Sequence, residues 1–181
     1  KLSLTWNAPS GTLTGYDLEY ATNAGFTGST VAPVPVGTSF TLAGLTQNTT
    51  YHLRLRAKNA NGAPSPNSNA VSATTLPNPP DVPAGLSASN VGANGFTINW
   101  TAPGGPLTGY VLDVATDNGF GTVVQSFTPG SGATNQPVGS LNANTTYYFR
   151  IKAVNTGGES AFITSNQLTL PAAPDGFAVQ G

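Results

Sequence analysis

Hydrophobic and polar residues alternate along several short stretches of the chain. In the stretch 51–58, Tyr51, Leu53 and Leu55 alternate with histidine and arginine, and the stretch 2–6 alternates in the same way. A period of two places apolar side chains on one face of a strand and polar side chains on the other. Strands with one apolar face and one wet face predict antiparallel sheets that pack face to face.

The strand pattern occurs twice in the 181 residues. Trp6 is matched by Trp100, 94 positions later, and Tyr51 is matched by Tyr147, 96 positions later. The two additional residues fall in a Gly-, Ser- and Pro-rich stretch of the second repeat, where a loop can absorb them. The sequence therefore predicts two copies of one all-β unit.

The motifs of both repeats resemble the fibronectin type III family. They include a Trp followed closely by Pro, a Gly-Tyr-x-Leu strand, and an Asn-Thr-Thr-Tyr turn that leads into a long alternating strand. The stretch 112–120 is similar to versions of the domain in secreted bacterial repeat proteins. The resemblance implies two tandem immunoglobulin-like Greek-key sandwiches. It also implies tyrosine corners at Tyr51 and Tyr147, and cores built around these two residues with Trp6 and Trp100.

The frame of the repeats is offset from the ends of the chain. The second repeat has a first strand near Leu86, about a dozen residues before Trp100, whereas only five residues precede Trp6. Residues 171–179 parallel residues 80–88. We therefore expect a first repeat without its first strand at 1–76, a proline-rich linker at 77–83, a complete repeat at 84–170, and a tail resembling a first strand at 171–181.

The tail has the apolar alternation that the first repeat lacks. Without a first strand, Leu2 and Leu4 would be partly uncovered on a strand with an unpaired edge, which native proteins rarely leave open. We expect Pro174, Phe177 and Val179 of one copy to cover this edge in the next copy, head to tail, by strand addition. The alternative is that the chain is a window of a longer tandem array, in which a flanking repeat supplies the strand.

Composition restricts the expected partners. Only 7% of residues are charged and the formal net charge is −1, so we expect neither nucleic-acid binding nor attraction to an anionic membrane. No apolar run reaches the roughly 20 residues of a membrane span. The chain begins directly in strand-like sequence, as expected of a mature product or an excised piece. Weak surface charge resists self-association little, so copies of the chain or flanking repeats are the expected partners. A carbohydrate or other surface ligand stays open.

No motif predicts catalysis, a metal site or a cofactor. The chain has no cysteine, and its one histidine, His52, is expected on the outward face of its strand. A zinc site or a Ser/His/acid triad would need further groups beside it. The turns around Asn23 and Asp117 offer too few oxygen ligands for calcium. We therefore expect a protein that is not an enzyme.

Charged residues are expected to face each other across neighbouring strands. Exposed cross-strand ion pairs explain the pattern, and a ligand patch is the alternative. The expected groups are Asp17 and Glu19 beside Arg54, Arg56 and Lys58, and Asp113 beside Arg150 and Lys152.

Three sequences fit the N-glycosylation pattern, at Asn48, Asn99 and Asn144. Asn48 and Asn144 lie in equivalent turns, and turn chemistry explains them without modification. Asn99 is expected to point outward. Glycosylation is the alternative for all three.

These patterns together predict a non-catalytic structural module of a secreted or cell-surface filament, stalk or adhesin. The alternative is a pair of spacer or accessory domains in a large secreted enzyme, such as a polysaccharide hydrolase. Ligand binding through loops is a third possibility, because fold does not fix function. An exposed row of aromatic residues would support sugar binding, but most aromatic residues here fall on inward positions.

Overall fold

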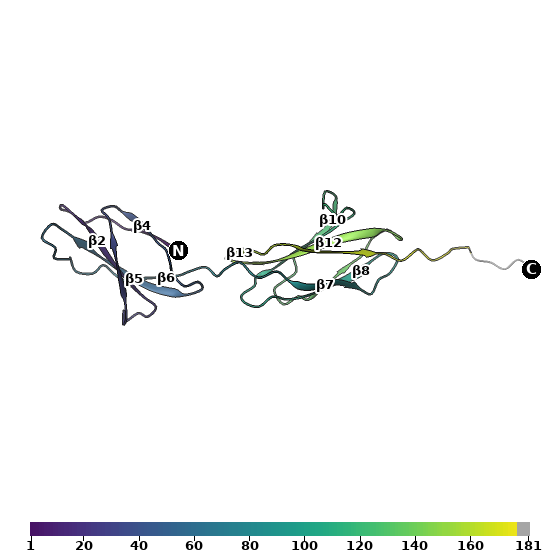
Figure 1. Ribbon diagram of the computed structural model, residues 1–181, viewed down its shortest axis with the longest axis horizontal. Helices are drawn as coiled ribbons and strands as arrows, with labels where there is room; N and C mark the ends of the chain where they lie inside the picture. Colours follow the sequence, from purple (N-terminus) through teal and green to yellow (C-terminus); the bar gives the residue numbers. More distant parts are fainter. Residues whose placement is uncertain (177–181) are drawn as a thin grey trace, which may run out of the picture. The chain divides into compact units, whose positions relative to one another are not determined.

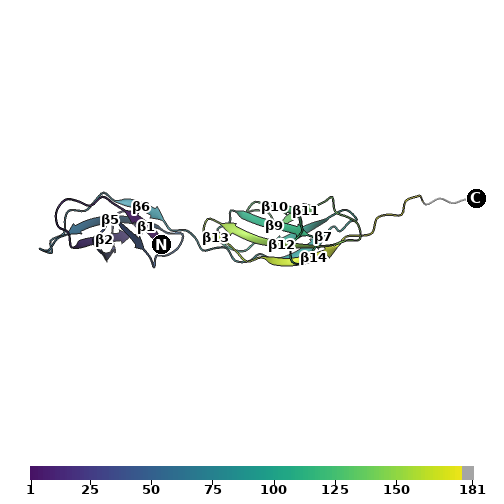
Figure 2. The ribbon, with the colours of Figure 1, turned by 90° about the horizontal axis from the view of Figure 1, so that it is seen from above.

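The structure, a computed structural model, describes residues 1–176. The chain forms two compact units, Lys1–Pro77 (unit 1) and Asn78–Gly181 (unit 2) (Figures 1 and 2). All regular secondary structure in the described residues is β-strand. The prediction of two tandem all-β sandwiches is confirmed.

Unit 1 is a sandwich of a two-stranded and a four-stranded antiparallel sheet. The small sheet pairs β1 with β4, and the large sheet has the order β3-β2-β5-β6. The strands are β1 (Leu2–Thr5), β2 (Gly15–Ala21), β3 (Thr30–Val34), β4 (Ser39–Leu42), β5 (Thr50–Lys58) and β6 (Val71–Thr74).

Unit 2 repeats this arrangement and has two additional strands, β7 and β13. Its sheets have the orders β11-β8-β7 and β10-β9-β12-β13, and β14 also pairs with β12. The strands are β7 (Ala84–Ser89), β8 (Phe96–Thr101), β9 (Gly109–Ala115), β10 (Val123–Phe127), β11 (Asn135–Val138), β12 (Thr146–Asn155), β13 (Gly158–Glu159) and β14 (Ile163–Leu168).

The inward positions of the alternating strands form the core of each unit. In unit 2, Ile98 of β8, Leu112 of β9 and Phe149 of β12 are fully buried. An aromatic pair recurs in both cores, with the two rings packed edge to face. The ring centroids of Trp6 and Tyr16 are 5.2 Å apart, and those of Trp100 and Tyr110 are 5.3 Å apart. Edge-on packing of this kind stabilises beyond the burial of apolar area.

Both tyrosine corners form as the resemblance implied. The backbone N–H of Thr46 donates to the Tyr51 hydroxyl at 3.0 Å, and the N–H of Asn142 donates to the Tyr147 hydroxyl at 3.0 Å. Each tyrosine therefore satisfies a backbone donor in the turn that precedes its own strand.

Residues 78–83, expected as part of a linker, pack onto unit 2. The Asn155 side chain donates to the Asn78 carbonyl at 2.7 Å. Pro83 is among the fully buried residues. The segment contains no strand, as its prolines predict.

The two units differ at the first strand of the small sheet. In unit 2, β8 pairs with β11 on one edge and with β7 on the other. In unit 1, β1 pairs with β4, and no strand of the described residues pairs with its other edge. This difference has a cost in burial: Trp100 is 4% exposed, whereas Trp6, expected in the core, is only half-buried.

Candidate functional site

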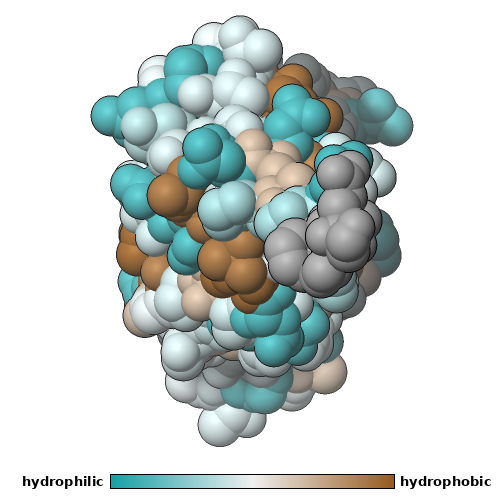
Figure 3. Space-filling model, turned by 90° about the vertical axis from the view of Figure 1, so that its right-hand side faces the viewer, coloured by the Kyte–Doolittle hydropathy of each residue, from teal (hydrophilic) through white to brown (hydrophobic). Residues whose placement is uncertain are grey.

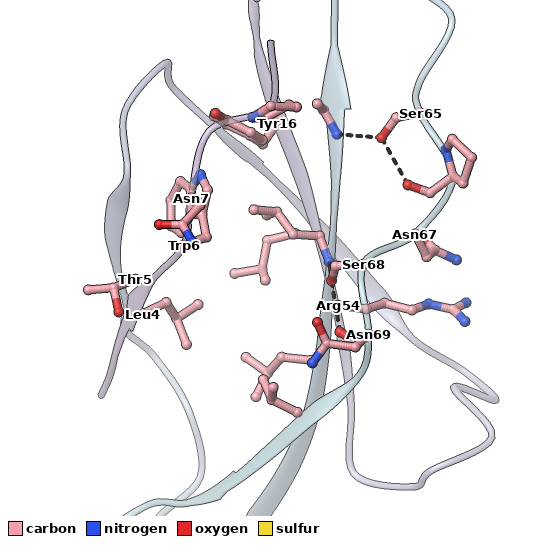
Figure 4. A pocket seen from close by; sticks show the side chains of 17 residues that line it. Leu4, Thr5, Trp6, Asn7, Tyr16, Arg54, Ser65, Asn67, Ser68 and Asn69 are labelled. Carbon is pink, nitrogen blue, oxygen red and sulfur yellow. Dashed lines mark hydrogen bonds between the residues drawn. The ribbon is translucent and has the colours of Figure 1, made fainter.

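A cleft opens along the free edge of β1. Its volume is about 550 Å³, and it lies between β1 and the segment 65–71 that leads into β6 (Figure 4). Leu4 and Trp6 lie on one side, Ser65 and Ser68 lie on the other, and apolar side chains of β2 and β5 form the floor.

A strand occupies the corresponding place in unit 2. There β7 pairs with β8 and contacts β14, the counterpart of β6. Beneath it, Phe96 is 3% exposed and Ile98 is 0% exposed. Their counterparts in unit 1, Leu2 and Leu4, are half-buried. The cleft is therefore the empty position of a strand. Of the two residues predicted as its acceptor edge, Leu4 lines the cleft, and Leu2 lies further along β1.

The free edge of β1 presents backbone hydrogen-bonding groups. The N–H of Trp6 donates to the Thr38 carbonyl at 3.0 Å, on the side of β4. Backbone groups alternate in direction along a strand. The N–H and C=O groups of Ser3 and Thr5 therefore face the free edge, where a further strand can pair with them.

The opposite wall of the cleft is polar and irregular. Residues 65–70 are exposed, and β6 begins only at Val71. The hydroxyl groups of Ser65 and Ser68 accept hydrogen bonds from the backbone N–H groups of Ala57 and Leu55, each at 3.0 Å. The Ser65 contact recurs in unit 2, where the Ser160 hydroxyl accepts from the N–H of Ala153. The Ser68 side chain, in contrast, occupies the place of the pairing between Ile163 of β14 and Ile151 of β12.

The proposed donor tail lies only partly within the described residues. Pro174 is exposed, and Phe177 and Val179 lie outside the described residues. Gly176 has a φ angle of +65°. The counterpart of Gly176 in unit 2 is Gly85 at the bulge of β7, which has a φ angle of +63°.

The predicted cross-strand ion pairs form for Arg54, Lys58 and Arg150, whereas Arg56 makes no ion pair among the described residues. Arg54 binds Glu19 at 2.7 Å, and Arg150 binds Asp113 at 2.9 Å. Lys152 binds Glu159 of β13 instead of the expected Asp113. The hairpin between β12 and β13 brings Glu159 beside Lys152, and Arg150 already occupies Asp113.

A second correction concerns exposure. Glu19 and Asp113 were expected on a wet face, but they are 9% and 8% exposed. Aromatic rings cover these pairs: the Arg54 guanidinium lies 4.0 Å from the Phe26 ring centroid, and Arg150 lies 4.4 Å and 4.2 Å from the rings of Phe120 and Phe162. Hydrogen bonds from Arg54 and Ser29 hold the pKa of Glu19 below its ordinary value.

Turn residues considered as ligands make local hydrogen bonds. The Asp117 carboxylate accepts from the N–H groups of Gly121 and Thr122 at 3.0 and 2.7 Å, and these bonds lower the pKa of Asp117. The side-chain oxygen Oδ1 of Asn23 accepts from the N–H of Thr27 at 3.0 Å. Within residues 1–176 no three His, Cys, Asp or Glu side chains cluster as metal ligands. His52 is half-buried on β5.

The three sequon asparagines occupy different environments. Asn48 and Asn144 are exposed and have φ angles of +45° and +48°, the left-handed conformation typical of asparagine in turns. Asn99 is half-buried on β8, and its amide donates to the Ser89 hydroxyl at 2.8 Å. The turn geometry accounts for the first two, and glycosylation stays a prediction.

Sequence patterns did not identify one repeated contact. Thr75 and Thr169 are buried just after β6 and β14, at 4% and 1% exposure. The Thr75 hydroxyl accepts from the N–H of Thr49 at 3.1 Å and donates to the Thr46 carbonyl at 2.6 Å. Thr169 makes the equivalent contacts in unit 2. The signal was a threonine at the same place in both repeats.

Exposed apolar side chains in the described residues do not form an aromatic row. The large apolar side chains with the greatest exposure are valines and leucines. Figure 3 shows apolar residues on one face as separate groups among hydrophilic ones. The described part of the chain also holds no helix with the length and apolar character to cross a membrane.

Two stacked antiparallel sheets with a tyrosine corner in each unit define a tandem immunoglobulin-like β-sandwich protein. The chain belongs to the fibronectin type III family, because the model of the "Fibronectin type III domain" matches residues 1–74 and 81–169.

Relatives with this domain have diverse names. The chain is 30% identical to Chitinase A1 of Niallia circulans over 96% of its own length and 24% of that protein. It is 34% identical to Endoglucanase B of Cellulomonas fimi over 90% of its own length and 16% of that protein. The chain thus spans a quarter or less of the length of these relatives.

A solved structure supports the fold. The FN1–FN3 domains of chicken CNTN1 match 93% of this chain and 62% of that chain, with a TM-score of 0.52 and 19% identity.

Proposed function

We propose that this chain is a non-catalytic structural module of an extracellular or cell-surface filament, stalk or adhesin. Its link to the next module is a β-strand that enters the empty position beside β1. The observation that carries the proposal is the cleft of about 550 Å³ in unit 1, at the place that β7 fills in unit 2. A sandwich with such a place is suited to joining another segment by strand addition.

The energetics favour a filled position. Covering the cleft with two apolar side chains would contribute roughly 3–6 kcal/mol. Each backbone hydrogen bond to the edge of β1 would add about 0.5–1.5 kcal/mol net. These gains are comparable to the whole stability of a small domain, about 5–15 kcal/mol.

The charged residues support a structural role. Glu19, Asp17 and Asp113 each bind a basic side chain of the neighbouring strand within the same sheet. The carboxylate of Asp117 caps backbone N–H groups. Groups of this kind serve the sandwich itself, so they favour a module without its own chemistry. The low charge of 7% is consistent with association between copies.

A second candidate is a spacer or accessory pair in a secreted polysaccharide hydrolase. The observation that favours it is the similarity to proteins named Chitinase A1 and Endoglucanase B, of which the chain covers only 24% and 16%. In that case the strand would come from a neighbouring domain of the same long protein.

A peptide experiment tests the proposed function. A synthetic peptide with the sequence of residues 82–91, which contains β7, is added to the 181-residue chain, and amide exchange is followed by NMR. We expect protection of the Ser3 and Thr5 N–H groups. A peptide of the same composition in scrambled order is the control. Strand addition is contradicted if the β7 peptide does not protect these amides in a chain whose cleft beside β1 holds no strand from another copy.

A binding experiment separates the two candidates. The chain is incubated with insoluble chitin and with cellulose, and both the pelleted protein and the released sugar are measured. A structural module of a filament or adhesin is expected to stay in solution and to release no sugar. Specific pelleting with either polymer would favour the accessory role, and sugar release would overturn the non-catalytic assignment.

A further inference from the structure

Resting on the proposed function, we infer that the cleft of unit 1 is the docking site for residues 174–180 of a second copy of this chain. The donated segment takes the register on β1 that β7 takes on β8. The partner is therefore a second copy of this chain.

The tail matches β7 position by position. Pro83 lies just before β7, Gly85 lies at its bulge, and Leu86 and Ala88 pack against the core of unit 2. At the same spacing the tail has the counterparts Pro174, Gly176, Phe177 and Val179. Because Ser87 pairs with Asn99 and Ala88 with Ile98, this register pairs Ala178 with Thr5 and Val179 with Leu4.

Gly176 already has the backbone conformation that the docked strand requires. Its φ of +65° matches the +63° of Gly85, where β7 shifts register between Ala84 and Ser87. Residues other than glycine rarely adopt this region. A residue that already has its bound conformation loses less entropy on binding, so the match at Gly176 favours docking.

The inward residues of the tail are apolar like those of β7, with phenylalanine in place of Leu86 and valine in place of Ala88. The core that would receive them differs in detail between the units. Unit 1 has Leu2 and Leu53 where unit 2 has the contacting rings of Phe96 and Phe149, but it has Tyr20 where unit 2 has Val114.

The symmetry of the contact sets the form of the assembly. The tail and the cleft are different surfaces, so the contact is heterologous. Repeated heterologous contacts close into a ring or extend into an open chain.

Two variants with complementary defects test this inference. Phe177→Asp places a charge at the inward position of the tail, and the matched control Ala178→Asp places it at the outward position. Thr5→Pro removes the N–H that faces the free edge, and the matched control Thr5→Val keeps it. Proline is tolerated on an edge strand whose N–H has no partner in the sandwich. Association is measured by sedimentation velocity over a range of protein concentrations.

We expect the unchanged chain and both controls to form multimers as concentration rises. Phe177→Asp and Thr5→Pro should each remain monomeric when alone. We expect the association constant of each to fall by at least roughly tenfold, which corresponds to a loss of about 1.4 kcal/mol in binding free energy. An equimolar mixture of the two should form 1:1 dimers and nothing larger, because it offers one intact cleft and one intact tail per pair. Dimer formation in the mixture also shows that both variants are folded.

Other outcomes overturn the inference. They are a monomeric unchanged chain, association of Phe177→Asp equal to that of Ala178→Asp, or a mixture that forms no dimer. If Thr5→Pro loses its fold, Leu4→Arg replaces it as the variant with a blocked cleft. If the β7 peptide fills the cleft while copies do not associate through the tail, the proposed strand addition stands and the donor assigned here is wrong.

Discussion

Glu19 lies on the outer face of β2, yet it is 9% exposed and binds Arg54 at 2.7 Å. The ring of Phe26 lies under the Arg54 guanidinium and reduces its contact with water. A carboxylate in such a place must be paired, because an unpaired charge with little access to water is strongly destabilising. Asp113, Arg150 and two phenylalanine rings repeat this arrangement in unit 2.

The first prediction concerns pH. Hydrogen bonds from Arg54 and Ser29 lower the pKa of Glu19 in the folded state. Its contribution to stability is therefore fully present above the unfolded pKa of Glu and is lost as pH falls through the lower folded value. Glu19→Gln should lower the free energy of unfolding at pH 7 and lose this effect in acid, as measured by urea denaturation at several pH values.

Glu159→Gln is the control for this prediction. The Glu159 side chain is 55% exposed beside Lys152, so its removal should change stability by less than about 1 kcal/mol. Equal effects of the two substitutions at pH 7, or a Glu19→Gln effect that grows in acid, would contradict the assigned role of the buried pair.

The second prediction concerns the tyrosine corners. Tyr51→Phe leaves the Thr46 N–H without its 3.0 Å acceptor, and Tyr147→Phe does the same to Asn142. Each should destabilise its own unit by about 0.5–1.5 kcal/mol, the net contribution of a typical hydrogen bond, because both bonds are partly buried. Tyr148→Phe, on the outward face of β12, should have little effect in the same denaturation experiment. A neutral Tyr51→Phe would show that water replaces the corner.

At the scale of elements, sequence periodicity predicted β1, β2 and β5, their counterparts β8, β9 and β12, and the inward face of each. It did not locate the shorter strands between them. Periodicity succeeded at the named strands because alternation determines which face of a strand is apolar, and the repeat showed which stretches correspond. It did not predict the burial of Glu19 and Asp113, because alternation assigns a face but not what covers it. Phe26 and Phe120 cover these pairs from turns where both have φ of +56°. Such turns leave no periodic signal.

The candidate site was predicted in part. The short segment before Trp6 indicated a missing strand, and the structure shows a cleft beside β1. The irregular wall at Ser68 was not predicted, since it depends on a side chain that replaces backbone pairing. Lys152 binds Glu159 because the β12–β13 hairpin brings the two side chains together. Hydrophobic alternation along single strands does not reveal such a hairpin.

The third prediction compares the effect of proline on stability at equivalent positions of β1 and β8. Asn99 of β8 pairs with Ser87 of β7, whereas the corresponding edge at Thr5 has no strand beside it in the described residues. Asn99→Pro should therefore destabilise unit 2 by about 1–3 kcal/mol through the lost ladder bond. Thr5→Pro should destabilise unit 1 by clearly less when the chain is dilute. Denaturation monitored by NMR of each unit measures both, and equal losses would contradict an open edge at β1.

At the scale of the whole molecule, unit 2 has its strand position filled by β7 and unit 1 does not. Anything that binds only the folded state stabilises it according to its concentration. The melting temperature of unit 1 should therefore rise with protein concentration, while that of unit 2 stays constant. NMR signals from each core, followed on heating at several concentrations, measure the difference. A concentration-independent unit 1 would contradict completion by another copy.

Strand donation in a defined register is the central claim, and cross-linking tests it most directly. The natural chain has no cysteine, so an introduced pair reacts without background. Thr5→Cys with Ala178→Cys places the two sulfur atoms on directly opposed residues, within the Cα separation of about 4.4–6.8 Å that a disulfide needs. Thr5→Cys with Val179→Cys, one position out of register and facing the core, is the control. On mild oxidation of the first pair we predict a ladder of covalent multimers on a non-reducing gel, with little cross-linking in the control. Monomers only, or equal ladders from both pairs, would contradict the account.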